Sequence, residues 1–213
     1  MFIHVIFGLP AQTRKEIELF KIILNHFPTN SKINIFEWGS GFSTTYYGQY
    51  LRKKNIEFEW YAIDNNKAWH EKIKRKVAKL GLAPCINLYL KEFVPFWQKP
   101  DWHDVPPPCG VFGPKLKEEK EYIEMPRSLN KRFDIIIVDA RFRKHCIEVA
   151  RDVLSERGVV ILHDAQKKHY HWGLGNFRFA KFFRMGFFVP FQNPSCQVWV
   201  GSIKNNKIFE DLK

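Results

Sequence analysis

The segment Ile33-Asn-Ile-Phe-Glu-Trp-Gly-Ser-Gly41 carries the pattern that most clearly indicates the fold of this chain. Its first four residues form a short apolar run that predicts a strand over 33–36, and a Gly-x-Gly loop follows. Ser43 and Thr44 are good N-caps for a helix that we expect to run to about Lys54. A strand, a glycine loop and a helix in this order indicate a parallel α/β unit.

The alternation of strand and helix continues on both sides of this stretch. A capping box from Thr13 to Glu16 opens a helix that Pro28 ends. Later strands are predicted over 58–63, 85–90, 133–138 and 159–162, and helices over about 69–80, 147–154 (with Gly158 as its C-cap) and 177–184. The chain should close with two strands, over 187–190 and 196–200. Five alternating strands predict an α/β class, a doubly wound Rossmann-like sandwich with a mostly parallel sheet and a terminal antiparallel strand pair.

Residues from about 91 to 132 interrupt the alternation, because prolines recur there without a clear period. A segment of this kind is usually functional or mobile. Apolar side chains such as Phe93 and Trp102 favour docking on the body of the protein, and a disordered insertion is the alternative. We therefore expect one domain over 1–213 with an irregular, Pro-rich insertion at about 91–132.

Composition narrows the class of partner. The chain has 213 residues, a hydrophobic fraction of 45% and a formal net charge of +12. The hydrophobic fraction excludes a disordered chain. The charge of this basic protein favours an anionic partner, which includes nucleic acid, a phosphorylated or uronic substrate and an acidic membrane surface.

The cysteines and the hydropathy of the sequence indicate the cellular compartment of the protein. The four cysteines are far apart and form no Cys-x-x-Cys pair, which argues against a disulfide scaffold and a zinc site and predicts a reducing, cytoplasmic environment. No apolar run approaches the ~20 residues that a membrane span needs. The apolar residues 1–10 lack a basic flank and a cleavage site, so we expect them to be part of the structure and no signal peptide.

Ligands of such sheets bind at the carboxyl ends of the parallel strands. The polar residues predicted there are Glu37 to Gly41, Asp64, Asp139, His163 and Asp164. The glycines let the backbone approach a ligand, and the following helix offers free amides to an anionic group such as a carboxylate.

The same motif also limits the class of nucleotide that this loop could bind. A dinucleotide fingerprint requires a third glycine where this chain has Thr44, and a Walker loop is absent. Asp64 suits the hydroxyls of a ribose, and Asn65 or Asn66 beside it would flank an adenine. A simple turn at Asp64 is the alternative.

With these motifs the chain resembles the class I S-adenosylmethionine-dependent methyltransferases. The resemblance lies in 35–43, 61–64, 133–139 and 158–164, and it spans about 33–201. It is more similar to the branches that methylate small molecules or sugars at oxygen than to those that act on nucleic acid. The resemblance implies that Gly39, Ser40 and Gly41 wrap the methionine part of S-adenosylmethionine, that Glu37 holds its amino group directly or through water, and that Asp64 binds the ribose. Glu92 would accept from the adenine amino group or is a solvated surface residue.

Methyl transfer to oxygen also requires removal of a proton. Asp139, His163 and Asp164 end two neighbouring strands, so His163 is the predicted base, oriented by Asp139 or Asp164. The alternatives are a structural histidine and carboxylates that cap helices. Two carboxylates here can bind a divalent cation in some O-methyltransferases, which carry Asn after the second acid. This chain has Ala165 there, so no metal is predicted.

Basic residues follow both strand ends. Arg141 and Arg143 follow Asp139, and Lys167 follows Asp164. If both sets face one cleft, the acceptor carries a carboxylate, phosphate or sulfate; two solvated loops are the alternative.

The predicted function is therefore S-adenosylmethionine-dependent methylation of an anionic small molecule or glycan, at oxygen. An RNA or DNA methyltransferase is favoured by the charge but lacks a base-holding motif. A non-catalytic cofactor- or nucleic-acid-binding module with the same fold is a third hypothesis, and Thr44 disfavours an NAD-dependent dehydrogenase. The acceptor and the oligomeric state are left open.

Overall fold

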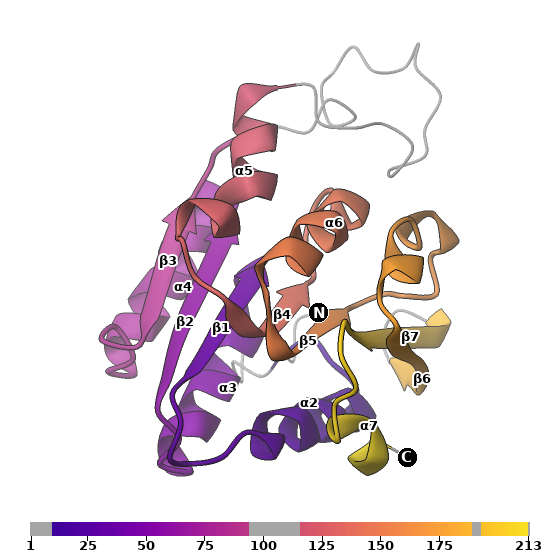
Figure 1. The fold of residues 1–213 in the computed structure, drawn as a ribbon. Helices are drawn as coiled ribbons and strands as arrows, with labels where there is room; N and C mark the ends of the chain where they lie inside the picture. Colours follow the sequence, from indigo (N-terminus) through magenta and orange to yellow (C-terminus); the bar gives the residue numbers. More distant parts are fainter. Residues whose placement is uncertain (1–9, 94–115, 189–192, 213) are drawn as a thin grey trace.

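The computed structural model describes residues 10–93, 116–188 and 193–212. Within these residues, seven strands form one sheet in the order β3-β2-β1-β4-β5-β7-β6 (Figure 1). The strands are β1 Ile33–Trp38, β2 Phe58–Asp64, β3 Ile86–Leu90, β4 Phe133–Val138, β5 Leu154–Leu162, β6 Phe179–Phe188 and β7 Asn193–Ser202. The first five are parallel, and β7 is antiparallel to both β5 and β6. The predicted fold class is confirmed.

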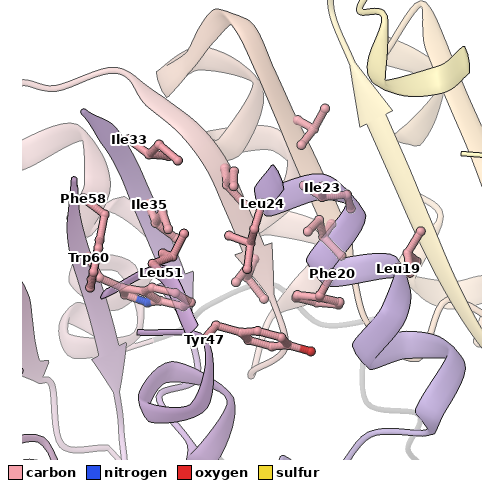
Figure 2. Packing of buried hydrophobic residues seen from close by; sticks show 14 of the residues in the cluster. Leu19, Phe20, Ile23, Leu24, Ile33, Ile35, Tyr47, Leu51, Phe58 and Trp60 are labelled. Atoms are coloured by element: carbon pink, nitrogen blue, oxygen red, sulfur yellow. The ribbon is translucent and has the colours of Figure 1, made fainter. Parts of the chain in front are cut away.

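Helices cover both faces of the sheet. They are α2 Arg14–His26, α3 Phe42–Lys53, α4 Lys67–Lys79, α5 Lys117–Ser128, α6 Arg143–Val153 and α7 Ile208–Asp211, with the short 3₁₀ turns η3 Lys168–Tyr170 and η4 Leu174–Asn176. The buried side chains of α2, α3 and α4 share one apolar cluster, and those of α5 and α6 share another. Figure 2 shows part of the first, where the rings of Phe20 of α2 and Tyr47 of α3 lie side by side with their centroids 5.1 Å apart.

The central strand β1 supplies both layers. Its side chains alternate across the sheet, so Ile33 and Ile35 join the first cluster while Phe36 and Trp38 join the second. A strand buried on both faces carries almost no polar side chain. Glu37 is therefore an exception that requires a functional or structural reason.

The prediction of a helix over 177–184 is wrong. Phe179–Phe188 forms strand β6, paired antiparallel with β7. In this stretch Phe183 and Met185 pack inward while Phe182 and Arg184 are exposed, which is a period of two. Aromatic side chains, which are frequent in this segment, are more favourable in a paired strand than in a helix. Gly158, predicted as a helix C-cap, lies inside β5, where a Cβ would stand 2.8 Å from the carbonyl oxygen of Phe133.

The predicted irregular insertion over 91–132 is too wide. Lys117–Ser128 forms α5, whose Tyr122 is buried against the sheet. Residues 94–115 lie outside the described residues, as do 1–9. None of the helices in the described parts of the chain is long and apolar enough to cross a bilayer.

Candidate active site

The loop after β1 is held to both neighbouring strands. The amide of Gly39 donates to the carbonyl of Ile63 at the end of β2 (2.8 Å), and the amide of Asp139 donates to the carbonyl of Trp38 (3.1 Å). Gly39 has a φ of +93°, and a Cβ on it would lie 2.4 Å from the Asp139 carbonyl oxygen. Only glycine fits this turn, which brings the predicted loop against the end of β4.

Helix α3 begins directly after the loop. Its N-cap is Gly41, which has no side chain to cap the helix, and the amide of Gly41 donates to Thr44 Oγ1 (2.9 Å). Ser43 and Thr44, which we expected to cap the helix, instead lie inside its first turn. The first amides of a helix have no partner within the helix. Without a side-chain cap, they are available to an anionic group.

Glu37 is almost completely buried, at 1% exposure. Its carboxyl group accepts hydrogen bonds from Ser43 (3.0 Å), Thr44 (2.5 Å) and the indole of Trp60 (3.0 Å). Burial raises the pKa of Glu37 to about 8, although these donors oppose the shift. Glu37 thus anchors the start of α3 to β1 and β2, and its contact with a cofactor stays a prediction.

Asp64, at the end of β2, lies beside the same loop. Its Oδ2 accepts from the hydroxyl of Ser40 (3.3 Å), and its Oδ1 accepts from the amide of Asn66 (2.9 Å). Burial raises the pKa of Asp64, against the effect of these donors. The Asn65 side-chain amide donates to the Phe93 carbonyl (3.1 Å). The structure therefore brings the loop, Asp64 and Asn65 together.

The ends of β4 and β5 also bring their polar residues together. His163 Nδ1 lies 3.2 Å from Asp139 Oδ1 and 3.7 Å from Asp164 Oδ1, while its Nε2 lies 2.9 Å from Glu16 Oε1. Burial alone would lower the pKa of His163, but Asp139 and Glu16 outweigh it and raise that pKa well above its ordinary value. The Asp139 side chain is 38% exposed, whereas both ring nitrogens of His163 are buried.

Arg143, at the start of α6, ties these carboxylates together. Its guanidinium lies 2.8 Å from Asp139 and 3.2 Å from Asp164, and it also donates to the His163 carbonyl (2.6 Å). Lys167 Nζ lies 3.2 Å from Asp164 Oδ2. In contrast, Arg141 is exposed, and its side chain has no hydrogen bond or ion pair with the part of the chain that the structure describes.

Comparison with known proteins shows to which family this chain belongs. Residues 36–165 match the family described as "Methyltransferase domain". The chain belongs to this methyltransferase family. The matched segment begins in β1 and ends just after Asp164, so it contains the glycine loop and both carboxylate-bearing strand ends. The resemblance drawn from the motifs is confirmed.

The methyltransferase also shares its fold with solved structures. A proposed caffeoyl-CoA O-methyltransferase from Staphylococcus aureus is 14% identical, with 93% of this chain and 87% of that chain covered and a TM-score of 0.58. The O-methyltransferase TomG from Streptomyces achromogenes, involved in tomaymycin synthesis and solved with S-adenosylmethionine, is 11% identical (95% and 86% covered, TM-score 0.58). A proposed rRNA methylase from Clostridium thermocellum is 10% identical (93% and 100% covered, TM-score 0.56). No curated protein matches.

Two residues of this candidate site were not predicted from the sequence. Glu16 was predicted only as part of the Thr13 capping box, which the structure confirms. Its other carboxylate oxygen reaches His163, and Cys196 of β7 lies beside the same pair. No local pattern indicates these contacts, because they depend on how α2 and β7 pack against the end of β5.

Proposed function

We propose that this methyltransferase uses S-adenosylmethionine to methylate an oxygen of an anionic small molecule or glycan. The observation that carries the proposal is the junction of the Gly39 loop, the Asp64 carboxylate and the uncapped start of α3, joined by the Ser40–Asp64 hydrogen bond (3.3 Å). Membership of the methyltransferase family supports it, as does the similar fold of TomG, which was solved with S-adenosylmethionine.

The residues at this junction fit that cofactor. The open amides of α3 suit the methionine carboxylate, and Asp64 can accept from the ribose hydroxyls. Asn65 lies where the second strand ends, as expected for a residue beside the adenine. Glu92 is exposed and lies 3.6 Å from Lys67, which supports the solvated surface role over an adenine contact.

We assign the proton-accepting role to Asp139. When bound, S-adenosylmethionine supplies a methyl group activated on a sulfonium. Asp139 is the more exposed of the two carboxylates in its cluster, at 38% against 24% for Asp164, whereas the nitrogens of His163 are both buried against carboxylates. His163 and Arg143 therefore orient Asp139, which accepts the proton of the acceptor hydroxyl, while the site mainly holds donor and acceptor in line. This differs from the expectation that His163 is the base.

The anionic acceptor follows from the basic residues around Asp139. Arg141 is exposed next to it, and Lys167 and Lys168 lie at the start of η3, beyond the end of β5. Arg143 and Lys167 are engaged by Asp139 and Asp164, so Arg141 is the cation best placed to meet a carboxylate, phosphate or sulfate.

Methylation of RNA or DNA is the second candidate, favoured by the net charge of +12 and by the similar fold of the proposed rRNA methylase. A thermal-shift panel of S-adenosylhomocysteine and NAD tests the cofactor, and transfer of labelled methyl to uronic acids, phosphorylated sugars and RNA tests the acceptor. We expect a shift with S-adenosylhomocysteine and label on a small anionic acceptor. Label on RNA with a steep salt dependence would favour the second candidate, and a cofactor shift without transfer of label would indicate a non-catalytic module.

A further inference from the structure

Behind the catalytic edge, three potential metal ligands meet from distant parts of the chain. Glu16 of α2, His163 at the end of β5 and Cys196 of β7 each offer one ligand atom, and these atoms all lie within 4.8 Å of one another. Glu16 is 1% exposed and Cys196 is also buried. The cluster is thus enclosed by α2 and the carboxyl edge of the sheet.

The hydrogen bonding of this cluster is incomplete. Glu16 Oε2 accepts from the amide of Thr13 (2.8 Å), but the buried Oε1 has no hydrogen-bond partner among the described residues. This oxygen lies 2.9 Å from Nε2 of His163, so the carboxylate and the protonated ring form a buried ion pair. A metal ion can take the place of the shared proton in such a pair.

We propose that Glu16, His163 and Cys196 bind a divalent transition metal ion of the zinc(II) type. A carboxylate, an imidazole and a thiolate form a borderline-soft donor set that suits zinc. Bonds of about 2.0–2.3 Å to a tetrahedral zinc ion place ligand atoms roughly 3.3–3.7 Å apart. Glu16 Oε1 and His163 Nε2 are 2.9 Å apart, slightly closer than this range, and all three ligand atoms lie within 4.8 Å of one another.

The surroundings of His163 support a cation at this place. Its Nδ1 lies 3.2 Å from Asp139, and a carboxylate on the second ring nitrogen is the usual partner of a metal-bound histidine. The carboxylates that raise the pKa of His163 would equally attract a metal ion, which would take the place of the proton on Nε2. Burial raises the pKa of Cys196 to about 12, so the ion must displace the thiol proton when it binds.

The ion would fasten α2 to the ends of β5 and β7 and fix the ring that orients Asp139. The sequence-based expectation of no metal concerned a different pair, Asp139 and Asp164, and the proposed site does not use their oxygens as ligands. The proposal is also independent of the cofactor, because neither the Gly39 loop nor Asp64 takes part in it.

The test is metal content and cobalt spectroscopy on the untagged full chain, purified without chelators. We expect stoichiometric zinc and, after exchange with Co²⁺, the thiolate-to-cobalt charge-transfer band of a four-coordinate site. Cys196→Ser should lose the band and weaken zinc binding by about tenfold or more. Cys146→Ser is the matched control, because Cys146 is an equally buried free cysteine on α6.

The proposal is overturned if the wild type retains no zinc and shows no band, or if Cys196→Ser behaves like Cys146→Ser. Far-UV circular dichroism establishes that each variant is folded. Binding of S-adenosylhomocysteine, measured on the same samples, separates failure of the metal site from failure of the proposed methyltransferase function.

Discussion

Gly39 and Asp139 meet backbone to backbone across the ends of β1 and β4, where a Cβ on Gly39 would lie 2.4 Å from the Asp139 carbonyl oxygen. The loop proposed to hold the cofactor and the residue proposed to accept the proton are therefore parts of one rigid junction. A disturbance of either backbone must move the other, which makes this contact a sensitive place to test the site.

Gly39→Ala should destabilise the protein more than Gly186→Ala does. Both glycines have positive φ, +93° and +80°, but a Cβ on Gly186 meets nothing within 4 Å. Backbone strain alone should cost about 1–2 kcal/mol at Gly186, and the clash with Asp139 should add about 1–3 kcal/mol at Gly39. Urea unfolding of both variants measures the difference, and equal losses would show that the close contact does not exist.

Asp139→Asn should reduce kcat by about 10²–10⁴-fold while leaving the affinity for S-adenosylhomocysteine nearly unchanged. The amide oxygen can still accept from Arg143, so the fold should persist, but an amide cannot take the acceptor proton. Asp152→Asn, which alters a carboxylate paired with Arg127 on the surface, is the control. A full kcat in Asp139→Asn would exclude the proposed role.

Substitution of each of the two arginines beside Asp139 should have a different effect. Arg141→Ala should raise the KM of the acceptor by about tenfold or more through the loss of a charged hydrogen bond, with stability and cofactor affinity kept. Arg143→Ala should instead cost about 3 kcal/mol of stability, because it leaves Asp139 and Asp164 without their buried partner. Steady-state kinetics and urea unfolding measure the two effects. The same phenotype for both variants would refute the division of roles.

The stability of the wild type should fall as the pH rises from about 5 to about 8. The pKa of Glu37 is about 8 in the folded chain and 4.5 in the reference state, so the folded state binds more protons in this window and loses stability with pH. The free energy of unfolding should fall by an amount on the order of 4 kcal/mol, at about 1.4 kcal/mol per pH unit. The fall levels off above the pKa of Glu37 in the folded state. The negative charge of the nearby Asp139 also raises the pKa of Glu37.

Glu37→Gln isolates this contribution. An amide can keep the contacts with Ser43, Thr44 and Trp60 without ionising, so the variant should show a flatter profile and gain stability relative to the wild type at about pH 9. Urea unfolding of both proteins across the pH range measures the difference. Parallel profiles would mean that Glu37 is not the group that titrates.

Local patterns predicted most of the framework. The β-branched run Phe133–Val138 reads as a doubly buried strand and is β4, and the capping box of Thr13 starts α2 where expected. Strand β6 was mistaken for a helix because its apolar residues also suit one, and only its pairing with β7 decides. The placement of Asp64 and Asp139 follows from topology, since parallel strands end at one edge.

The contacts that sequence could not supply are those between elements far apart in the chain. Glu16 meets His163 only because α2 packs near the ends of β5 and β7. Likewise, the position of Arg141, Arg143 and Lys167 after two strand ends predicted basic side chains facing the acceptor, whereas Arg143 and Lys167 are held by carboxylates. Such pairings depend on tertiary packing, which no spacing or periodicity encodes.

The junction of the Gly39 loop and Asp64 is the proposed binding site of the adenosyl cofactor. Isothermal titration of the wild type and Asp64→Asn with S-adenosylhomocysteine measures this binding. Asparagine keeps an oxygen for the Asn66 amide but loses the carboxylate that the ribose hydroxyls need. We predict saturable binding to the wild type and an affinity about 10–100-fold lower in the variant. Equal affinities, or no binding to the wild type, would show that this junction does not bind the cofactor through Asp64.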